Sequence, residues 1–108
     1  MCQFYHISHV QLDTHIQHLK NGDEQLYIAV SSKPAVVHTF TDEKLSLLFL
    51  DAAVGNITLP KSQFYTDYSI TQIDAGCVVD LTLNENNPLW GYDVKADEGQ
   101  FIIYLKQT

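Results

Sequence analysis

Histidine side chains are the first candidates for chemistry in this sequence. Four of the five histidines form two pairs with the same spacing, His6-x-x-His9 and His15-x-x-His18. A zinc site needs three or four ligands that converge in space. Residues three apart on a strand point to opposite faces, whereas a helix over residues 9–20 would place His15 and His18 on one face. Because neither spacing matches a recognised metal motif, we predict no metal site.

The segment that carries the second histidine pair is compatible with two structures. Its apolar residues between positions 12 and 19 recur at helical spacing, and Asn21-Gly22 follows like a C-terminal stop. Asn-Gly is also the strongest short signal for a β-hairpin, and here it separates residues 15–20 from residues 24–30. We favour the hairpin over the helix.

Catalytic motifs are missing from the chain. The sequence has no Gly-x-Ser-x-Gly elbow, no Cys-x-x-Cys pair and no Gly-x-Gly spacing for a phosphate loop. Adjacent acids occur three times, each time in a predicted turn, where carboxylates serve backbone hydrogen bonding and solubility. These pairs are Asp23-Glu24, Asp42-Glu43 and Asp97-Glu98. We therefore expect solvated acids, no catalytic residues, no cofactor and no enzymatic activity.

Aromatic residues are the stronger candidates for ligand binding, because their rings stack on sugars and dock on partner proteins. Three of them lie in the link between the two halves of the chain and are expected at the surface. The other two share a predicted strand face with Val94, which favours core packing. The candidates are Phe64, Tyr65 and Tyr68 in the link, and Trp90 and Tyr92 in the strand.

Charge and hydropathy exclude several classes of protein. The net charge is −7, and all six basic residues are lysines spread singly along the chain. Nucleic-acid binding needs clustered Lys and Arg, so we expect no nucleic-acid partner. No run of 18 apolar residues is present, which argues against membrane insertion.

The compartment stays open at the level of sequence. The first residues lack the basic and apolar regions of a signal peptide, so the chain is either cytosolic or a piece of a larger exported protein. Two cysteines, Cys2 and Cys77, either pair or stay reduced. Cys77 lies in an apolar strand, where a cysteine packs as a small core residue.

Strand signals run through the whole chain and occur in the same order in both halves. The 108 residues fit one domain, and alternating apolar segments end in polar, proline-containing loops. We predict an internal repeat over about 5–53 and 64–106, and an all-β fold: a small sandwich of two antiparallel sheets from a duplicated three- to four-stranded unit. The matched features are 26–30 with 79–83, Pro34 with Pro88, 36–40 with 90–94, the acidic turns, and 47–50 with 102–105.

The duplicated pattern over residues 5–106 resembles the AMIN domain, which accompanies bacterial cell-wall amidases and some secretin pore proteins. The resemblance lies in the strand at 78–83, the loop closing on Pro88, Leu89-Trp90-Gly91-Tyr92-Asp93-Val94, the acidic turn, the strand at 101–105, and Leu47-Leu48-Phe49-Leu50-Asp51. It implies a symmetric β-sandwich with a non-catalytic role at the cell envelope, where the domain binds peptidoglycan.

Two functions follow as expectations. The first is a peptidoglycan-binding or targeting module in the periplasm or at the cell surface, within a larger exported protein such as an amidase. The second is a protein-interaction domain, for another envelope protein, that uses a sheet edge or the aromatic surface at Phe64, Tyr65 and Tyr68.

Overall fold

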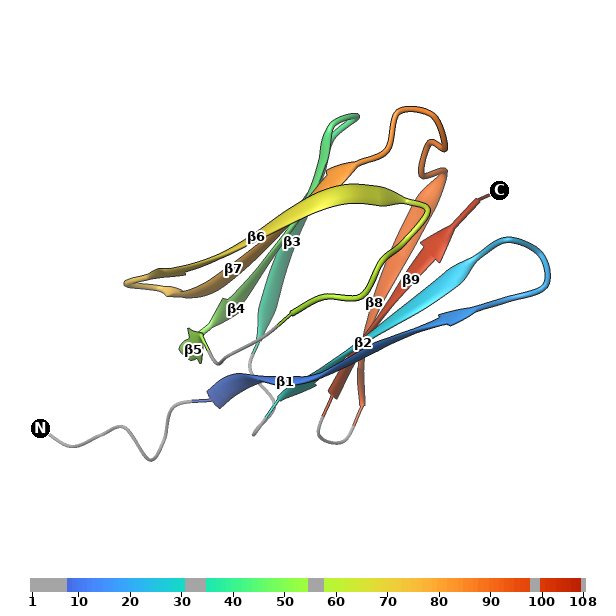
Figure 1. The fold of residues 1–108 in the computed structure, drawn as a ribbon. Coiled ribbons are helices and arrows are strands. Elements are labelled where there is room, and N and C mark those ends of the chain that lie inside the picture. The colour runs from blue at the N-terminus through green and yellow to red at the C-terminus, as the bar shows by residue number, and fades with distance from the viewer. Residues whose placement is uncertain (1–7, 31–34, 55–57, 98–99, 108) are drawn as a thin grey trace, which may run out of the picture.

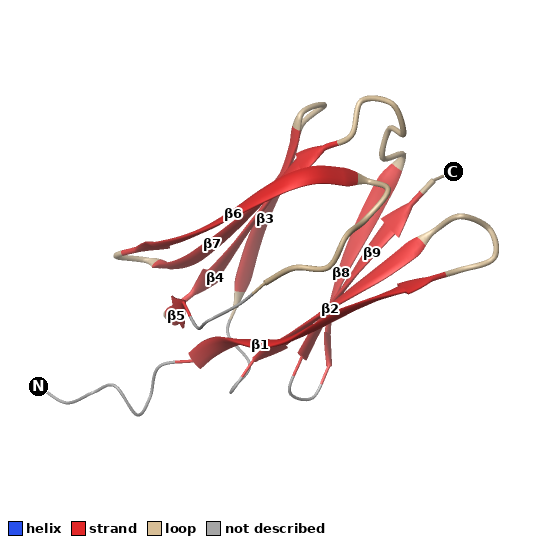
Figure 2. Ribbon diagram, in the orientation of Figure 1, coloured by secondary structure: helices blue, strands red, loops and turns tan. Residues whose placement is uncertain are grey.

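The computed structural model describes residues 8–30, 35–54, 58–97 and 100–107, and these residues form strands, turns and loops without a helix. The strands assemble into two sheets (Figures 1 and 2). Their bounds are β1 Ser8–His18, β2 Glu24–Val30, β3 Val36–Phe40, β4 Lys44–Leu50, β5 Ala52–Val54, β6 Tyr65–Ile73, β7 Gly76–Leu83, β8 Gly91–Asp97 and β9 Gln100–Lys106.

The two sheets have the strand orders β5-β1-β2-β9-β8 and β3-β4-β7-β6. Neighbouring strands are antiparallel, with one exception: the short β5 pairs in parallel with the start of β1. The predicted small β-sandwich is therefore confirmed. The parallel β5 is an addition that no sequence signal indicated.

Each half of the chain contributes one hairpin to each sheet. In the first sheet β1–β2 from the first half pairs with β9–β8 from the second, and in the other sheet β6–β7 pairs with β4–β3. The two halves are therefore interlocked, and neither half has a complete sheet of its own. The order of strands is the same in both halves, while the duplication of the sequence itself stays a prediction.

The register of the paired strands corrects one detail of the predicted repeat. Leu47 pairs with Val79 in one sheet, and Ile103 pairs with Leu26 in the other. Leu47 therefore corresponds to Ile103, one residue further along than the predicted match with Ile102. A slip of one residue turns every side chain of a strand to the opposite face, so the burial pattern decides the alignment.

The core lies between the sheets and draws on both of them. Alternate residues of β2, β4, β7 and β9 point inward and are buried, and the rings of Phe49 and Phe101 meet across the interface with centroids 5.2 Å apart. Leu48 and Leu50 are half-buried, so β4 is a central strand with only one face fully buried. The fully buried aliphatic side chains are Leu26, Ile28, Leu45, Leu47, Val79, Leu81, Ile103 and Leu105.

The β1–β2 hairpin decides between the two structures considered for the N-terminal segment. Residues 15–18 pair with residues 24–27 in an antiparallel ladder, and Gly22 in the connecting turn has a φ of +94°. Only glycine adopts such a conformation without strain from a Cβ atom. The hairpin is thus confirmed, and residues 15–18 form the end of the long strand β1.

Gly76, at the start of β7, provides a test of the packing between β4 and β7. Its φ is +153°, and a Cβ atom there would overlap the carbonyl oxygen of Phe49, whereas a Cβ atom at Gly91 meets nothing within 4 Å. We expect Gly76→Ala to lower the free energy of unfolding by about 2–3 kcal/mol and Gly91→Ala to change it by less than about 0.5 kcal/mol. Chemical denaturation of both variants measures the difference, and equal stability would contradict the described register.

Candidate functional site

The structure separates the five aromatic residues predicted to bind ligand into three environments. Phe64 is fully buried in the core, so its expected surface position is wrong. Tyr65 is 5% exposed, so its expected surface position is also wrong, whereas Tyr68 is half-buried; both residues line a pocket beside β6. Tyr92 is half-buried against the core, as expected from its strand face, whereas Trp90 is 68% exposed. Only the two tyrosines of β6 lie at a concave surface.

The exposure of Trp90 corrects the expectation of core packing. Trp90 precedes β8, the edge strand of its sheet, and its backbone N–H donates to the carbonyl oxygen of Lys106 at the end of β9. Alternation along β8 places Tyr92 and Val94 on the inward face, where both pack against the core. Trp90 continues that alternation past the end of the edge strand, and its side chain remains mostly exposed.

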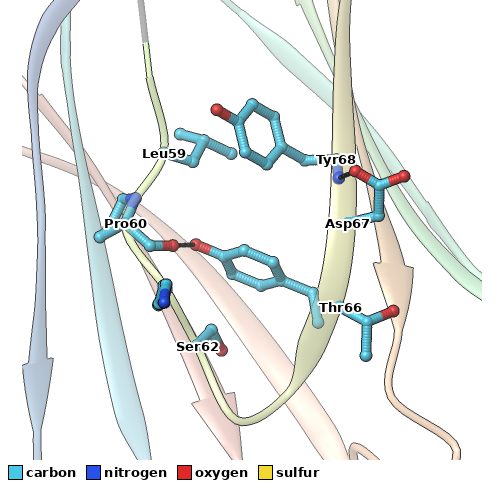
Figure 3. Close-up of a pocket in the computed structure, with 8 residues that line it drawn as sticks. Leu59, Pro60, Ser62, Thr66, Asp67 and Tyr68 are labelled. Carbon is cyan, nitrogen blue, oxygen red and sulfur yellow. Dashed lines mark hydrogen bonds between the residues drawn. The ribbon is translucent and has the colours of Figure 1, made fainter.

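The pocket lies between β6 and the segment 58–64, which we call the connector because it leads from β5 to β6 (Figure 3). Its volume is about 350 Å³. Its lining combines apolar and aromatic side chains with a lysine, an aspartate and hydroxyl-bearing residues. The lining residues are Leu59, Pro60, Lys61, Ser62, Tyr65, Thr66, Asp67 and Tyr68.

Two hydrogen bonds fix the aromatic wall of the pocket. The Tyr65 hydroxyl donates to the carbonyl oxygen of Pro60, so this side chain joins β6 to the connector. The backbone N–H of Tyr68 donates to Asp67 Oδ1 over 2.8 Å, beside a register shift between Tyr65 and Asp67. In Figure 3 the ring of Tyr68 lies next to Leu59. The Tyr65 hydroxyl is thus already engaged, while the half-buried Tyr68 ring is available to a ligand.

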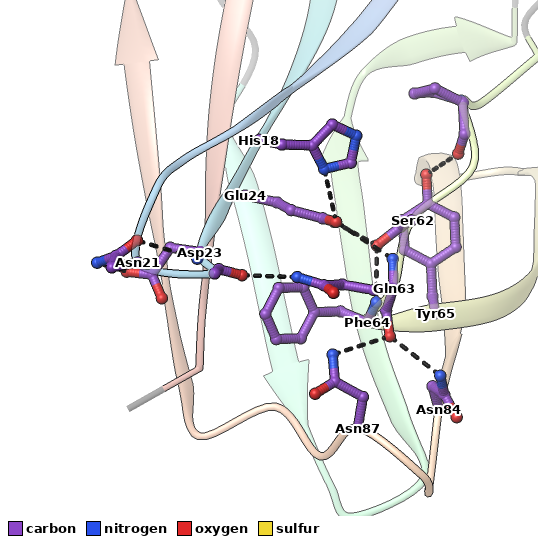
Figure 4. A network of polar contacts seen from close by, with 12 residues as sticks. His18, Asn21, Asp23, Glu24, Ser62, Gln63, Phe64, Tyr65, Asn84 and Asn87 are labelled. Atoms are coloured by element: carbon purple, nitrogen blue, oxygen red, sulfur yellow. Dashed lines mark hydrogen bonds and ion pairs between the residues drawn. The ribbon is translucent and has the colours of Figure 1, made fainter.

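A buried carboxylate, Glu24, holds the other side of the connector (Figure 4). Glu24 is fully buried, and three groups surround its two oxygens. Ser62 Oγ donates to Oε1 over 2.5 Å, the Gln63 backbone N–H donates to Oε2 over 3.2 Å, and His18 Nδ1 lies 3.0 Å from Oε2. The prediction that Glu24 is a solvated turn acid is therefore wrong.

Gln63 connects this network to a loop of each sheet. Its side-chain Nε2 donates to the carbonyl oxygen of Gly22 in the β1–β2 turn, over 2.7 Å. Its own carbonyl oxygen accepts from the side chains of Asn84 and Asn87, at 3.0 and 3.1 Å. The connector is thus hydrogen-bonded to a hairpin of one sheet and to the loop that leaves the other sheet, which fixes the wall of the pocket.

The alternation of apolar residues along β2 indicates that Glu24 is buried. Glu24 is in phase with Leu26 and Ile28, and all three share the inward face of β2. Its counterpart in the predicted repeat is Cys77, which is also fully buried. Reading the alternation one step further toward the N-terminus would have placed a carboxylate in the core, where it needs hydrogen-bond donors.

Burial and charge shift the acidity of two groups near the core. Desolvation raises the pKa of the Tyr65 phenol well above its usual value of 10.0, and the negative charge of Glu24 and the neighbouring Tyr68 add to the effect. Desolvation also raises the pKa of the Cys77 thiol above 9.0. Both groups are therefore neutral at physiological pH, and Cys77 is a thiol rather than a nucleophilic thiolate.

His15 and His18, both on β1, take up separate contacts. The His15 ring stacks on Tyr27 with centroids 4.3 Å apart, while His18 contacts Glu24, so the pair points to opposite faces as predicted for a strand. Among the residues that the structure describes, no three His, Cys, Asp or Glu side chains lie close enough to hold a metal ion. His6 and Cys2 lie outside the described residues, and Cys77 is a buried, free cysteine.

A scan against protein-family models and searches of curated proteins and of solved structures gave no match to this chain. In the described part of the chain no helix is long and apolar enough to cross a membrane.

Replacing Glu24 tests the network behind the pocket. Glu24→Ala leaves the Gln63 N–H and Ser62 without their acceptor and opens space in the core, so we expect a loss of about 2–3 kcal/mol in the free energy of unfolding. Glu24→Gln keeps one acceptor oxygen and should lose less. Glu43→Ala, in an exposed turn, is the matched control and should change stability by less than about 0.5 kcal/mol. Similar values for the alanine variants would contradict the network.

The raised pKa of Tyr65 predicts a loss of stability at alkaline pH. Above about pH 10 the unfolded chain releases this proton and the folded protein retains it, so the unfolding free energy falls by up to about 1.4 kcal/mol per pH unit from this group. Cys77 adds a loss of the same sign from pH 9.0 upward. Denaturation midpoints measured at increasing pH should fall less steeply in Tyr65→Phe. An identical slope in both proteins would refute the assignment.

Proposed function

We propose that the protein is a non-catalytic binding module of the bacterial cell envelope that takes up peptidoglycan in the pocket beside β6. The single observation that carries this proposal is the pocket itself. It combines a half-buried aromatic ring, Tyr68, with polar side chains at its rim. Ligand sites in proteins characteristically combine a concave apolar surface with a few convergent polar groups.

The composition of the pocket suits a saccharide. A sugar ring presents an apolar face that stacks on an aromatic ring, here Tyr68, and hydroxyl groups that hydrogen-bond at the edges. Thr66 and Asp67 supply hydroxyl and carboxylate groups on β6, and Lys61 on the connector supplies a cation. Peptidoglycan also carries carboxylates, for which an exposed lysine is a suitable partner in a protein with a net charge of −7. A second cavity, of about 500 Å³, has no aromatic lining residue and fits this ligand less well.

The ligand class and the envelope location draw support from the AMIN-like order of strands, loop prolines and acidic turns in both halves of the sequence. On this proposal the chain acts within a larger exported protein, in the periplasm or at the cell surface. It holds a partner domain, such as an amidase, close to its substrate. The network around Glu24 supports the same role because it gives the pocket a fixed wall before any ligand binds.

Co-sedimentation with purified peptidoglycan sacculi tests the proposal. We expect the protein to be retained and Tyr68→Ala to weaken binding about tenfold or more, because the variant removes the stacking surface. Trp90→Ala is the matched control: it removes an exposed aromatic ring from the opposite edge of the molecule and should bind like the unaltered protein.

Three outcomes would count against this assignment. Retention no greater than that of a denatured control refutes peptidoglycan binding. Equal binding by Tyr68→Ala and the unaltered protein refutes the pocket as the site. Loss of binding in Trp90→Ala alone places the ligand at the β8 edge instead. Circular dichroism of each variant establishes that the fold is intact.

A further inference from the structure

The outermost strands are β5 and β8 in one sheet and β3 and β6 in the other, and β3 differs from the other three. Natural proteins protect sheet edges with short strands, bulges or charged residues, because unpaired backbone groups invite pairing with another chain. β5 is three residues long, β6 contains a register shift between Tyr65 and Asp67, and β8 carries Asp93, Lys95 and Asp97. β3, with the sequence Val-Val-His-Thr-Phe, has a continuous register with β4 and no Asp, Glu, Lys or Arg.

The backbone of β3 has a regular row of free hydrogen-bonding groups. At its two ends the Ala35 carbonyl oxygen accepts from the Leu50 N–H and the Thr41 N–H donates to the Lys44 carbonyl oxygen, so odd-numbered residues face β4. In an antiparallel ladder the direction alternates from residue to residue. The N–H and C=O groups of the intervening even-numbered residues therefore point away from β4, and no described strand pairs with them on that side.

The side chains of β3 leave apolar surface exposed on both faces of the sheet. Val37 is 50% exposed on the outer face, and Phe40 is 40% exposed on the face toward the other sheet. On that inner face, Tyr92 of β8 contacts His38 and Phe40: its hydroxyl lies 2.6 Å from His38 Nδ1, and its ring meets Phe40 edge-on at 5.3 Å. These contacts hold β3 in a strand conformation, and no described strand pairs with its outer edge.

We propose that β3 is a self-association edge, which pairs antiparallel with β3 of a second copy about a two-fold axis at His38. This register brings Val36 opposite Phe40 of the second copy and Val37 opposite Thr39 of the second copy. It uses the free backbone groups of Val36, His38 and Phe40, because residues directly opposite each other then exchange both hydrogen bonds. The sheet β3-β4-β7-β6 continues through both molecules.

The sequence of β3 is self-complementary in this register, which identifies a second copy as the partner. Aromatic–β-branched and β-branched–β-branched pairs are among the favourable cross-strand neighbours, and the strand supplies one of each twice across the axis. A two-fold interface requires such self-complementarity. Each copy has a net charge of −7, so close approach is easiest at an edge without carboxylates.

The interface is short, so the expected dimer is weak. A five-residue strand buries far less surface than the ~1,600 Å² of a standard interface, and associations of this size are transient. Its formation is also independent of the proposed ligand pocket, because β3 and β6 are opposite edges of the same sheet. Tyr68→Ala is therefore expected to dimerise normally, and loss of peptidoglycan binding says nothing about the β3 edge.

Sedimentation equilibrium over a wide range of protein concentrations tests this inference. The unaltered protein should show a reversible monomer–dimer equilibrium. In the double variant Val37→Lys/Thr39→Lys, two lysines face two lysines across the axis, and the association constant should fall at least about tenfold from like-charge repulsion. In Val37→Lys/Thr39→Glu the same positions carry opposite charges, so the dimer should be retained. Both side chains are exposed, which keeps the fold unaffected.

The matched control is Thr71→Lys, an exposed threonine on β6 at the other edge of the sheet, which should leave dimerisation unchanged. A protein that is monomeric at every concentration overturns the inference, even if β3 then accepts an extended peptide from another protein. A dimer that responds equally to both double variants, or that Thr71→Lys disrupts, also overturns it. Circular dichroism spectra confirm folding in each case.

Discussion

The buried carboxylate of Glu24 is the interaction on which the arrangement of this molecule depends. A charge without solvent must be hydrogen-bonded, and the donors come from Ser62 and Gln63 of the connector. Satisfying Glu24 therefore fixes a loop that has no strand pairing of its own. The connector in turn supplies Leu59 and Phe64 to the core and one wall of the pocket. The packing of the core, the position of the connector and the wall of the candidate site therefore all depend on the hydrogen bonds that Glu24 accepts.

The interlocking of the two halves determines which parts of the surface are open. Each sheet combines hairpins from both halves and has two outermost strands, and the connector joins β2 of one sheet to β6 of the other. On the other side, β8 contacts β3 through Tyr92, which meets His38 and Phe40. The candidate pocket beside β6 and the proposed self-association edge at β3 lie at opposite edges of one sheet.

Aromatic residues show how far residue type alone falls short in locating a site. Phe64 and Tyr65 are adjacent in the link between the halves, where a loop position indicated surface, yet both are buried because the connector crosses the edge of the core. Trp90 has the alternation of a core residue and is exposed because it lies past the end of an edge strand. In each case the environment depends on segments distant in the sequence, which no local pattern describes.

The sequence by itself determined the positions of most strands and the sandwich class, and it favoured the β1–β2 hairpin over a helix, since period-two alternation and Asn-Gly turns are local properties of the chain. It also indicated that His15 and His18 point apart. Tertiary structure alone decided the exchange of hairpins between the halves, the register of β4 relative to β9, and the burial of Glu24 with its donors. These features depend on which segments meet across the core, and the free energy of that choice comes from non-local packing and hydrogen bonding.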